Sequence, residues 1–203
     1  MITIVDYGIG NVGAIENMLD VLGLGCDVTA DPARVRAADR LILPGVGAFD
    51  RAMSSLRTLG LGDALNEAVL HRRVPVMGVC LGMQVMARRS DEGTEPGLGW
   101  IAADVCRLRP PAESGLKVPH IGWYPVTPTG NELFPESAGP ERFYFVHSYA
   151  LTCDNANDVA ATVEFAGARC CAVARGNIYG VQFHPEKSHR YGMRLFKTFG
   201  TLS

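Results

Sequence analysis

Residues 74–84 read Val74-Pro-Val-Met-Gly-Val-Cys-Leu-Gly-Met-Gln84, a pattern typical of a strand that turns sharply into a helix. An apolar run ends at Cys80, which has a glycine two residues before it and another two residues after it, and an amphipathic helical pattern follows. Gly78-x-Cys80-x-Gly82 is the cysteine counterpart of the G-x-S-x-G nucleophile elbow, a sharp turn from strand to helix. Glycine is required at the flanking positions because Cβ atoms would collide there. The stretch therefore predicts a reactive cysteine above the carboxyl edge of a sheet.

The first half of the chain alternates strand-like and helical patterns. Apolar runs cover residues 2–6, 41–43 and 74–79. Helical stripes lie between them, at Val12, Ile15, Leu19 and Leu22, and again at Leu61, Leu65, Ala68 and Val69. Near-continuous apolar strands that alternate with helices indicate a parallel sheet covered by helices on both faces.

The second half has a different rhythm of shorter strand-like runs separated by Gly, Pro and Asn. These runs cover residues 103–108, 119–126, 142–151, 159–165, 169–174 and 178–183, and they predict an antiparallel or mixed extension of the sheet. A last helix is expected from about Ser188. No linker, repeat or low-complexity stretch divides the chain, so we expect one α/β domain over residues 1–203, built on an open, mixed, mainly parallel sheet.

Composition excludes several classes of partner. The 203 residues carry a net charge of −2, and the basic residues are scattered, which gives no footprint for nucleic acid or for a membrane. The chain start reads as a strand and not as a signal peptide, so a cytoplasmic location is expected. Five of the six cysteines are expected to serve packing only. We predict no metal and no cofactor.

A base for Cys80 is predicted in Gly180-Val-Gln-Phe-His-Pro-Glu186. His184 and Glu186 are two residues apart and would project to the same side of an extended backbone, which Pro185 favours for its predecessor. A carboxylate that holds one imidazole nitrogen leaves the other free to take the cysteine proton. Taken singly, these residues could also be a buried cysteine, a core histidine and a helix-start acid. Together they predict a Cys80–His184–Glu186 triad.

Backbone N–H groups are expected to stabilise the oxyanion of the reaction. The N–H of Leu81 follows the nucleophile directly. Pro44-Gly-Val-Gly47 lies at the end of another parallel strand, on the same sheet edge, and offers the N–H groups of Val46 and Gly47. The two glycines would also allow a peptide flip that makes or breaks this oxyanion hole.

Motifs along nearly the whole chain resemble those of the class I, triad-type glutamine amidotransferases. The elbow and His-Pro-Glu mark that superfamily. The motifs Leu43-Pro-Gly-Val-Gly-Ala-Phe49, Val118-Pro-His-Ile-Gly-Trp123 and His184-Pro-Glu-Lys-Ser188 are similar to those of the glutaminase subunits of imidazole glycerol phosphate synthases. The resemblance implies a flavodoxin-like fold.

The resemblance also implies a reaction. Cys80 would attack the carboxamide of L-glutamine, His184 would protonate the departing ammonia, and water would hydrolyse the glutamyl thioester to glutamate. Positions that hold the substrate in the family correspond to Gln84 and Glu92, one and three helical turns beyond the elbow, and to His147, Ser148 and Tyr149.

Family members form a heterodimer with a (β/α)8-barrel cyclase subunit, which uses the ammonia to make imidazole glycerol phosphate and AICAR in histidine biosynthesis. Family positions at the docking face or ammonia exit correspond to Asn11, Trp123, Tyr144 and Lys187. Two departures fall in these segments, because Tyr124 stands where the family usually has asparagine and Ala14 lies where a polar residue is common.

Two other functions stay open at this point. One is the glutaminase of another class I pathway, such as the chorismate or pyridoxal phosphate pathways, or a γ-glutamyl hydrolase. The other is a catalytically silent subunit that only binds a partner.

Overall fold

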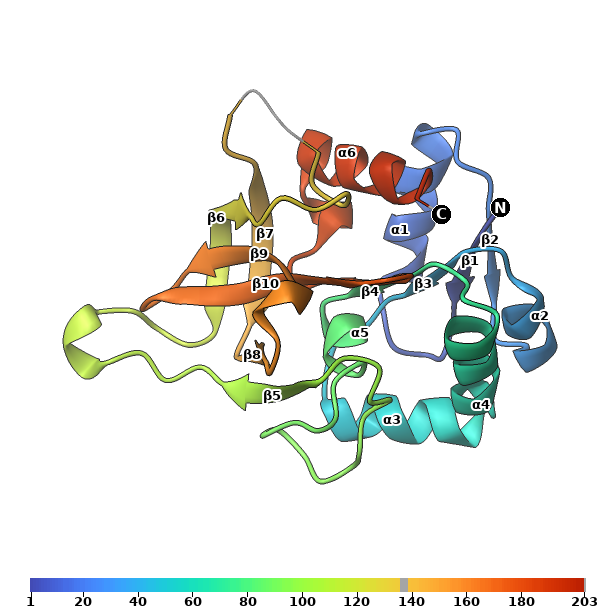
Figure 1. Ribbon diagram of the computed structural model, residues 1–203, viewed down its shortest axis with the longest axis horizontal. Coiled ribbons are helices and arrows are strands. Elements are labelled where there is room, and N and C mark those ends of the chain that lie inside the picture. The colour runs from blue at the N-terminus through green and yellow to red at the C-terminus, as the bar shows by residue number, and fades with distance from the viewer. Residues whose placement is uncertain (136–138, 203) are drawn as a thin grey trace.

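A nine-stranded mixed sheet forms the centre of the protein, in a computed structural model that describes residues 1–135 and 139–202. Its order is β2-β1-β3-β4-β11-β10-β9-β6-β7 (Figure 1). The parallel part contains β1 (Ile2–Val5), β2 (Cys26–Thr29), β3 (Leu41–Leu43), β4 (Val76–Val79) and β11 (Ile178–Val181). The antiparallel part contains β10 (Ala168–Arg175), β9 (Val159–Glu164), β6 (His120–Pro128) and β7 (Arg142–His147). The predicted fold class is confirmed.

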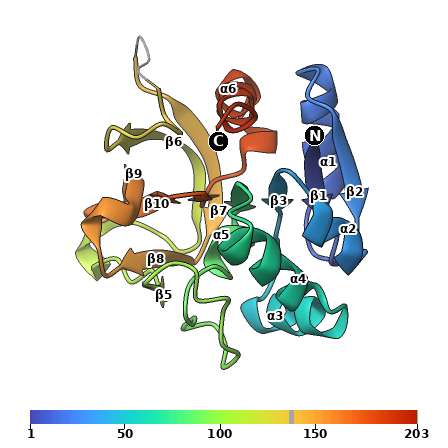
Figure 2. The same ribbon diagram turned by 45° about the vertical axis from the view of Figure 1, so that its right-hand side comes forward.

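Helices cover both faces of the sheet, as Figures 1 and 2 show. One face carries α1 (Val12–Val21) and α6 (His189–Phe199). The opposite face carries α2 (Pro32–Ala37), α3 (Phe49–Thr58), α4 (Leu61–Asn66) with a π-helical turn at Glu67–His71, and α5 (Leu81–Gln84). Strand side chains alternate between the two layers, so Val76 packs into one and Met77 into the other. In the described ranges, no helix is long and apolar enough to cross a membrane.

The run at 142–151 is two strands, and the prediction of a single one was wrong. β7 ends at His147, and β8 (Tyr149–Cys153) pairs with β5 (Ala103–Arg107) in a separate two-stranded sheet. The chain changes sheets at Ser148, whose carbonyl accepts the N–H of Leu108. This crossing exposes the backbone between the two sheets on the side of Cys80.

The helix after the elbow is one turn long, so the prediction of an amphipathic helix was wrong. All four residues of α5 are buried. Beyond it the chain turns away, because Arg88 N–H donates to Ala103 O and Asp91 N–H donates to Val105 O, which adds this segment to the edge of β5. Glu92 therefore stands on a loop and not three helical turns along a helix.

Candidate active site

Cys80 occupies a strained turn between β4 and α5. Its φ of 55° and ψ of −110° are rare for a residue with a side chain. Such strain costs on the order of 1–3 kcal/mol and is typical of functional sites. A Cβ at Gly78 would lie 2.6 Å from Gly82 O, and a Cβ at Gly82 would lie 1.8 Å from Leu43 O. Both glycines are therefore required by contact with backbone.

His184 and Glu186 form a buried hydrogen-bonded pair. His184 Nδ1 lies 2.8 Å from Glu186 Oε1, and the side chains are 2% and 1% exposed. The segment that carries this pair is fixed to β7, since His184 N–H donates to Tyr144 O. Ser188 adds a second link, because its hydroxyl donates to His184 O and accepts from Tyr144 N–H. The predicted same-side placement of His184 and Glu186 is thus what the structure shows, although Glu186 belongs to a short 3₁₀ turn, Pro185–Lys187.

The electrostatics of this pair favour a charged imidazole. Burial by itself lowers the pKa of His184, but hydrogen bonds to Cys80 and Glu186 outweigh it and raise the pKa to about 9. At neutral pH this corresponds to an imidazolium beside the cysteine sulfur. An imidazolium in this position can serve as a general acid for a leaving group.

A cavity of about 370 Å³ opens in front of Cys80. Ten of the predicted site residues line it, and these ten come from five separate parts of the chain. The lining consists of Val46, Gly47, Cys80, Leu81, Gln84, Glu92, Pro119, Val146, His147, Ser148, Tyr149 and His184. Glu186 lies behind His184 and completes the predicted triad from outside the cavity. The structure therefore brings together every predicted catalytic, oxyanion and substrate-binding residue.

The N–H of Leu81 is already engaged. It donates to Gly45 O at 3.3 Å, and Gly45 is packed so tightly against the elbow that a Cβ there would lie 2.6 Å from Gly82 N. Gly47 has a φ of +103°, and a Cβ there would meet no described atom within 4 Å. The two segments predicted to form the oxyanion hole are thus adjacent. One of the predicted donors, the N–H of Leu81, is occupied by the carbonyl of Gly45 in the other segment.

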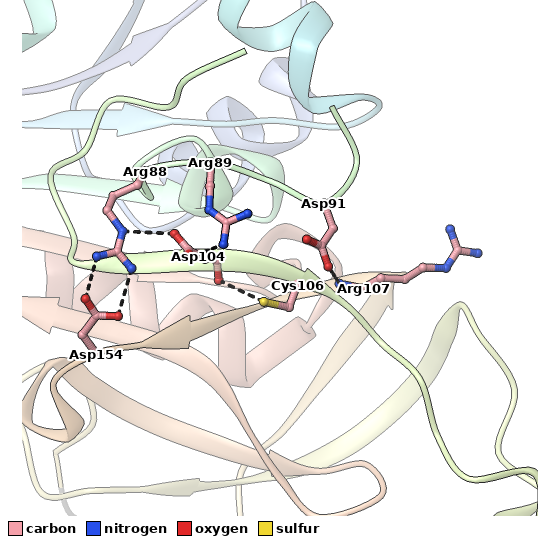
Figure 3. A network of polar contacts seen from close by, with 7 residues as sticks. All are labelled: Arg88, Arg89, Asp91, Asp104, Cys106, Arg107 and Asp154. Atoms are coloured by element: carbon pink, nitrogen blue, oxygen red, sulfur yellow. Dashed lines mark hydrogen bonds and ion pairs between the residues drawn. The ribbon is translucent and has the colours of Figure 1, made fainter. Parts of the chain in front are cut away.

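Glu92 is held at the cavity by a network on the neighbouring surface. Its Oε2 accepts from Phe49 N–H at 2.9 Å. Figure 3 shows how the preceding loop is fixed, with Arg88 bridging Asp104 and Asp154. Arg89 also pairs with Asp104. Each exposed ion pair contributes little alone, but the network joins this loop to β5 and to the end of β8.

Two further buried residues, His120 and Gln182, were not predicted as part of the site. His120 Nδ1 lies 3.0 Å from His147 Nε2, and His147 Nδ1 lies 2.8 Å from Tyr149 O, so the imidazole Nδ1–H of His147 holds the cavity backbone. Burial lowers the pKa of each histidine to about 4, which keeps both rings neutral. Gln182 is fully buried beside Cys80. A polar residue in an apolar strand run was the available signal for Gln182.

Three of the four residues predicted for the partner face lie close together, because Trp123 and Lys187 both approach the ring of Tyr144. Trp123 and Tyr144 have ring centroids 6.1 Å apart, and Lys187 Nζ lies 5.9 Å from the Tyr144 centroid. Trp123 also stacks on His189. Asn11 is exposed at the start of α1. Tyr124, the departure from the family pattern, packs its ring 4.1 Å from that of His120.

Comparison with known proteins identifies the family. The family Glutamine amidotransferase class-I matches residues 3–201. Imidazole glycerol phosphate synthase subunit HisH 2 of Pseudomonas aeruginosa is 46% identical over 203 residues and covers 100% of both chains. The protein of the same name from Methanococcus maripaludis is 44% identical over 200 residues, with 98% of each chain covered.

Solved structures share the fold at low sequence identity. A glutamine amidotransferase superposes with a TM-score of 0.75 and 18% identity, covering 98% of this chain and 99% of that chain. PurLQS from Thermotoga maritima gives a TM-score of 0.74 and 16% identity, covering 98% and 96%. The resemblance predicted from the sequence is confirmed by the family match and the relatives. The chain belongs to the class I glutamine amidotransferases and, within them, to the imidazole glycerol phosphate synthase HisH subunits.

Proposed function

We propose that this protein hydrolyses glutamine and delivers ammonia to a cyclase subunit for the synthesis of imidazole glycerol phosphate and AICAR in histidine biosynthesis. The single observation that carries the proposal is the buried His184–Glu186 pair with its imidazole against a strained elbow cysteine. The names of the relatives support the pathway, and they favour it over the chorismate and pyridoxal phosphate alternatives.

The reaction follows from the arrangement of Cys80, His184 and Glu186. The Cys80 thiolate attacks the carboxamide carbon of glutamine, and the His184 imidazolium gives its proton to the amide nitrogen as the C–N bond breaks and ammonia leaves. Neutral His184 then deprotonates a water molecule that attacks the glutamyl thioester. The C–S bond breaks, glutamate leaves, and the thiolate and imidazolium are restored. Glu186 orients the ring and stabilises its charge.

The far end of the cavity suits the amino-acid end of glutamine. Gln84 uses its Nε2 to donate to Tyr149 O at 3.2 Å and to Gln182 Oε1 at 3.0 Å, which leaves its carbonyl oxygen as an acceptor. This oxygen and the Glu92 carboxylate would accept hydrogen bonds from the substrate ammonium group. The backbone of His147, Ser148 and Tyr149 forms the opposite wall.

Turnover by the chain alone is expected to be slow. The Leu81 N–H cannot stabilise an oxyanion while it donates to Gly45 O, so the 44–47 segment must turn first. We assign this change to binding of a (β/α)8-barrel cyclase in a heterodimer. Trp123, Tyr144 and Lys187 would lie at the ammonia exit, where a sealed interface prevents protonation of ammonia by bulk water, and Asn11 would join the docking face.

The test is ammonia release from glutamine, measured while the chain is titrated with the cyclase subunit and its nucleotide ligand. Wild type and Cys106→Ala, which alters a cysteine on β5 outside the cavity, should both be activated until the subunits are equimolar. Cys80→Ala should stay at background. Equal activity of Cys80→Ala and wild type would refute the enzyme assignment, and the absence of activation by the cyclase would refute the partner.

A further inference from the structure

Gln182 is a fully buried polar side chain that touches the candidate nucleophile. It directly follows β11 and has 0% of its surface exposed. Its Nε2 lies 3.7 Å from Cys80 Sγ, within hydrogen-bond range for sulfur. In an extended backbone, Gln182 and His184 point to the same side and Phe183 points to the other, into the apolar core. Two side chains from one segment therefore meet the sulfur.

The orientation of the Gln182 amide is set by its neighbours. Tyr149 O can only accept hydrogen bonds, so the group that Gln84 presents to it at 3.2 Å must be its amide NH₂. The same NH₂ lies 3.0 Å from the Gln182 side chain, which must then present its carbonyl oxygen. The NH₂ of Gln182 is left on the side of Cys80. A backbone carbonyl thus fixes which end of Gln182 faces the sulfur.

We propose that Gln182 is a positioning residue that donates an N–H hydrogen bond to the Cys80 thiolate. The inference rests on the proposed function, in which this thiolate is the nucleophile. An amide cannot transfer its proton under these conditions, so it stabilises the negative sulfur without competing with His184 as the acid. Through Gln84 and Tyr149 the donor is also tied to the wall of the cavity.

The charges around the sulfur are consistent with this role. Tyr7, two residues beyond the end of β1, donates its hydroxyl to Pro44 O, and burial raises the pKa of the phenol, so it stays uncharged. Neutral His147 lines the cavity, and Glu92 stands on its exposed rim. Glu186 is shielded from the sulfur by the His184 ring. Among the described side chains, His184 and Gln182 are placed to donate to the sulfur and to stabilise negative charge on it.

The experiment follows alkylation of Cys80 by iodoacetamide as a function of pH, read by mass spectrometry of the Cys80 peptide in the complex with the cyclase. Gln182→Met keeps an unbranched side chain of similar length and removes the donor to Cys80. It also removes the oxygen that accepts from Gln84, which keeps its hydrogen bond to Tyr149 O. Its alkylation profile should move toward higher pH by about one unit, the tenfold change expected for one hydrogen bond to a charged group. In the same complex, kcat for glutamine should fall about tenfold, with KM changed less than twofold.

An unchanged alkylation profile in Gln182→Met would overturn the inference. If Gln182→Met does not fold, as judged by thermal unfolding, Gln182→Leu provides the same test with a shorter apolar side chain. Cys106→Ala serves as the matched control and should keep the wild-type profile. The outcomes separate the two claims: an inactive wild type whose profile still shifts in Gln182→Met refutes only the proposed function, whereas an active wild type with no shift refutes only the role of Gln182.

Discussion

Replacing Gly82 with alanine tests whether the elbow is built by close backbone contact. Gly82 is in the first turn of α5, where helix propensity alone would make alanine more stable by up to about 1 kcal/mol. The new Cβ would lie 1.8 Å from Leu43 O, 2.8 Å from Leu43 C and 3.2 Å from Pro44 C. These are backbone atoms of β3 and of the loop that follows it, and β3 pairs with both β1 and β4, so they cannot move aside like a flexible side chain.

The expected result is a loss of about 3 kcal/mol of unfolding free energy, the upper part of the range for overpacking. For a chain of this size, that lowers Tm by roughly 6–12 °C. Urea and thermal unfolding of Gly82→Ala and Gly62→Ala provide the comparison. Gly62 lies in α4, where a Cβ would meet no described atom within 4 Å, so alanine there should add about 0.5–1 kcal/mol. Stability of Gly82→Ala at or above that of wild type would refute the steric account.

Three further predictions concern the buried ionisable groups. Glu186→Gln should lower kcat by roughly 10- to 100-fold, because the charge-assisted bond to His184 is worth about 1.5–3 kcal/mol; a steady-state assay giving wild-type kcat would exclude this role. Ammonia release should fall as pH rises through about 9, where the His184 imidazolium loses its proton, and a flat pH–rate profile to pH 10 would contradict this assignment. Unfolding free energy should fall as pH drops from about 6.5 to about 4, since His120 and His147 have lowered pKa values when folded and the unfolded chain takes up protons first. The urea midpoint of unfolding should decline less steeply over this pH range in His120→Phe than in wild type. Equal slopes in the two proteins would show that His120 is not a source of the pH dependence.

The parts of the site that depend on local sequence were predictable. The glycine spacing around Cys80 and the two-residue spacing of His184 and Glu186 are set by short-range geometry, so the turn and the hydrogen-bonded pair could be expected from the sequence. The same holds for the alternation of apolar runs and helices in the parallel half of the sheet.

Features set by distant contacts were not predictable in this way. The helix after Cys80 stops at Gln84 because the chain then pairs with β5, which begins only at Ala103, and this places Glu92 on a loop. The strand run at 142–151 breaks at Ser148 because its two halves join different sheets. The contact between Gln182 and Cys80 likewise depends on β11 lying beside β4.

Trapping the covalent intermediate would show directly whether Cys80 is the nucleophile. The complex of this chain with its cyclase would be saturated with glutamine, quenched in acid during turnover, digested and analysed by mass spectrometry. We expect a glutamyl adduct on the Cys80 peptide of wild type and of Cys106→Ala, and none in Cys80→Ala, which should also release no ammonia. Sustained ammonia release by Cys80→Ala, or an adduct on a different residue, would contradict this expectation.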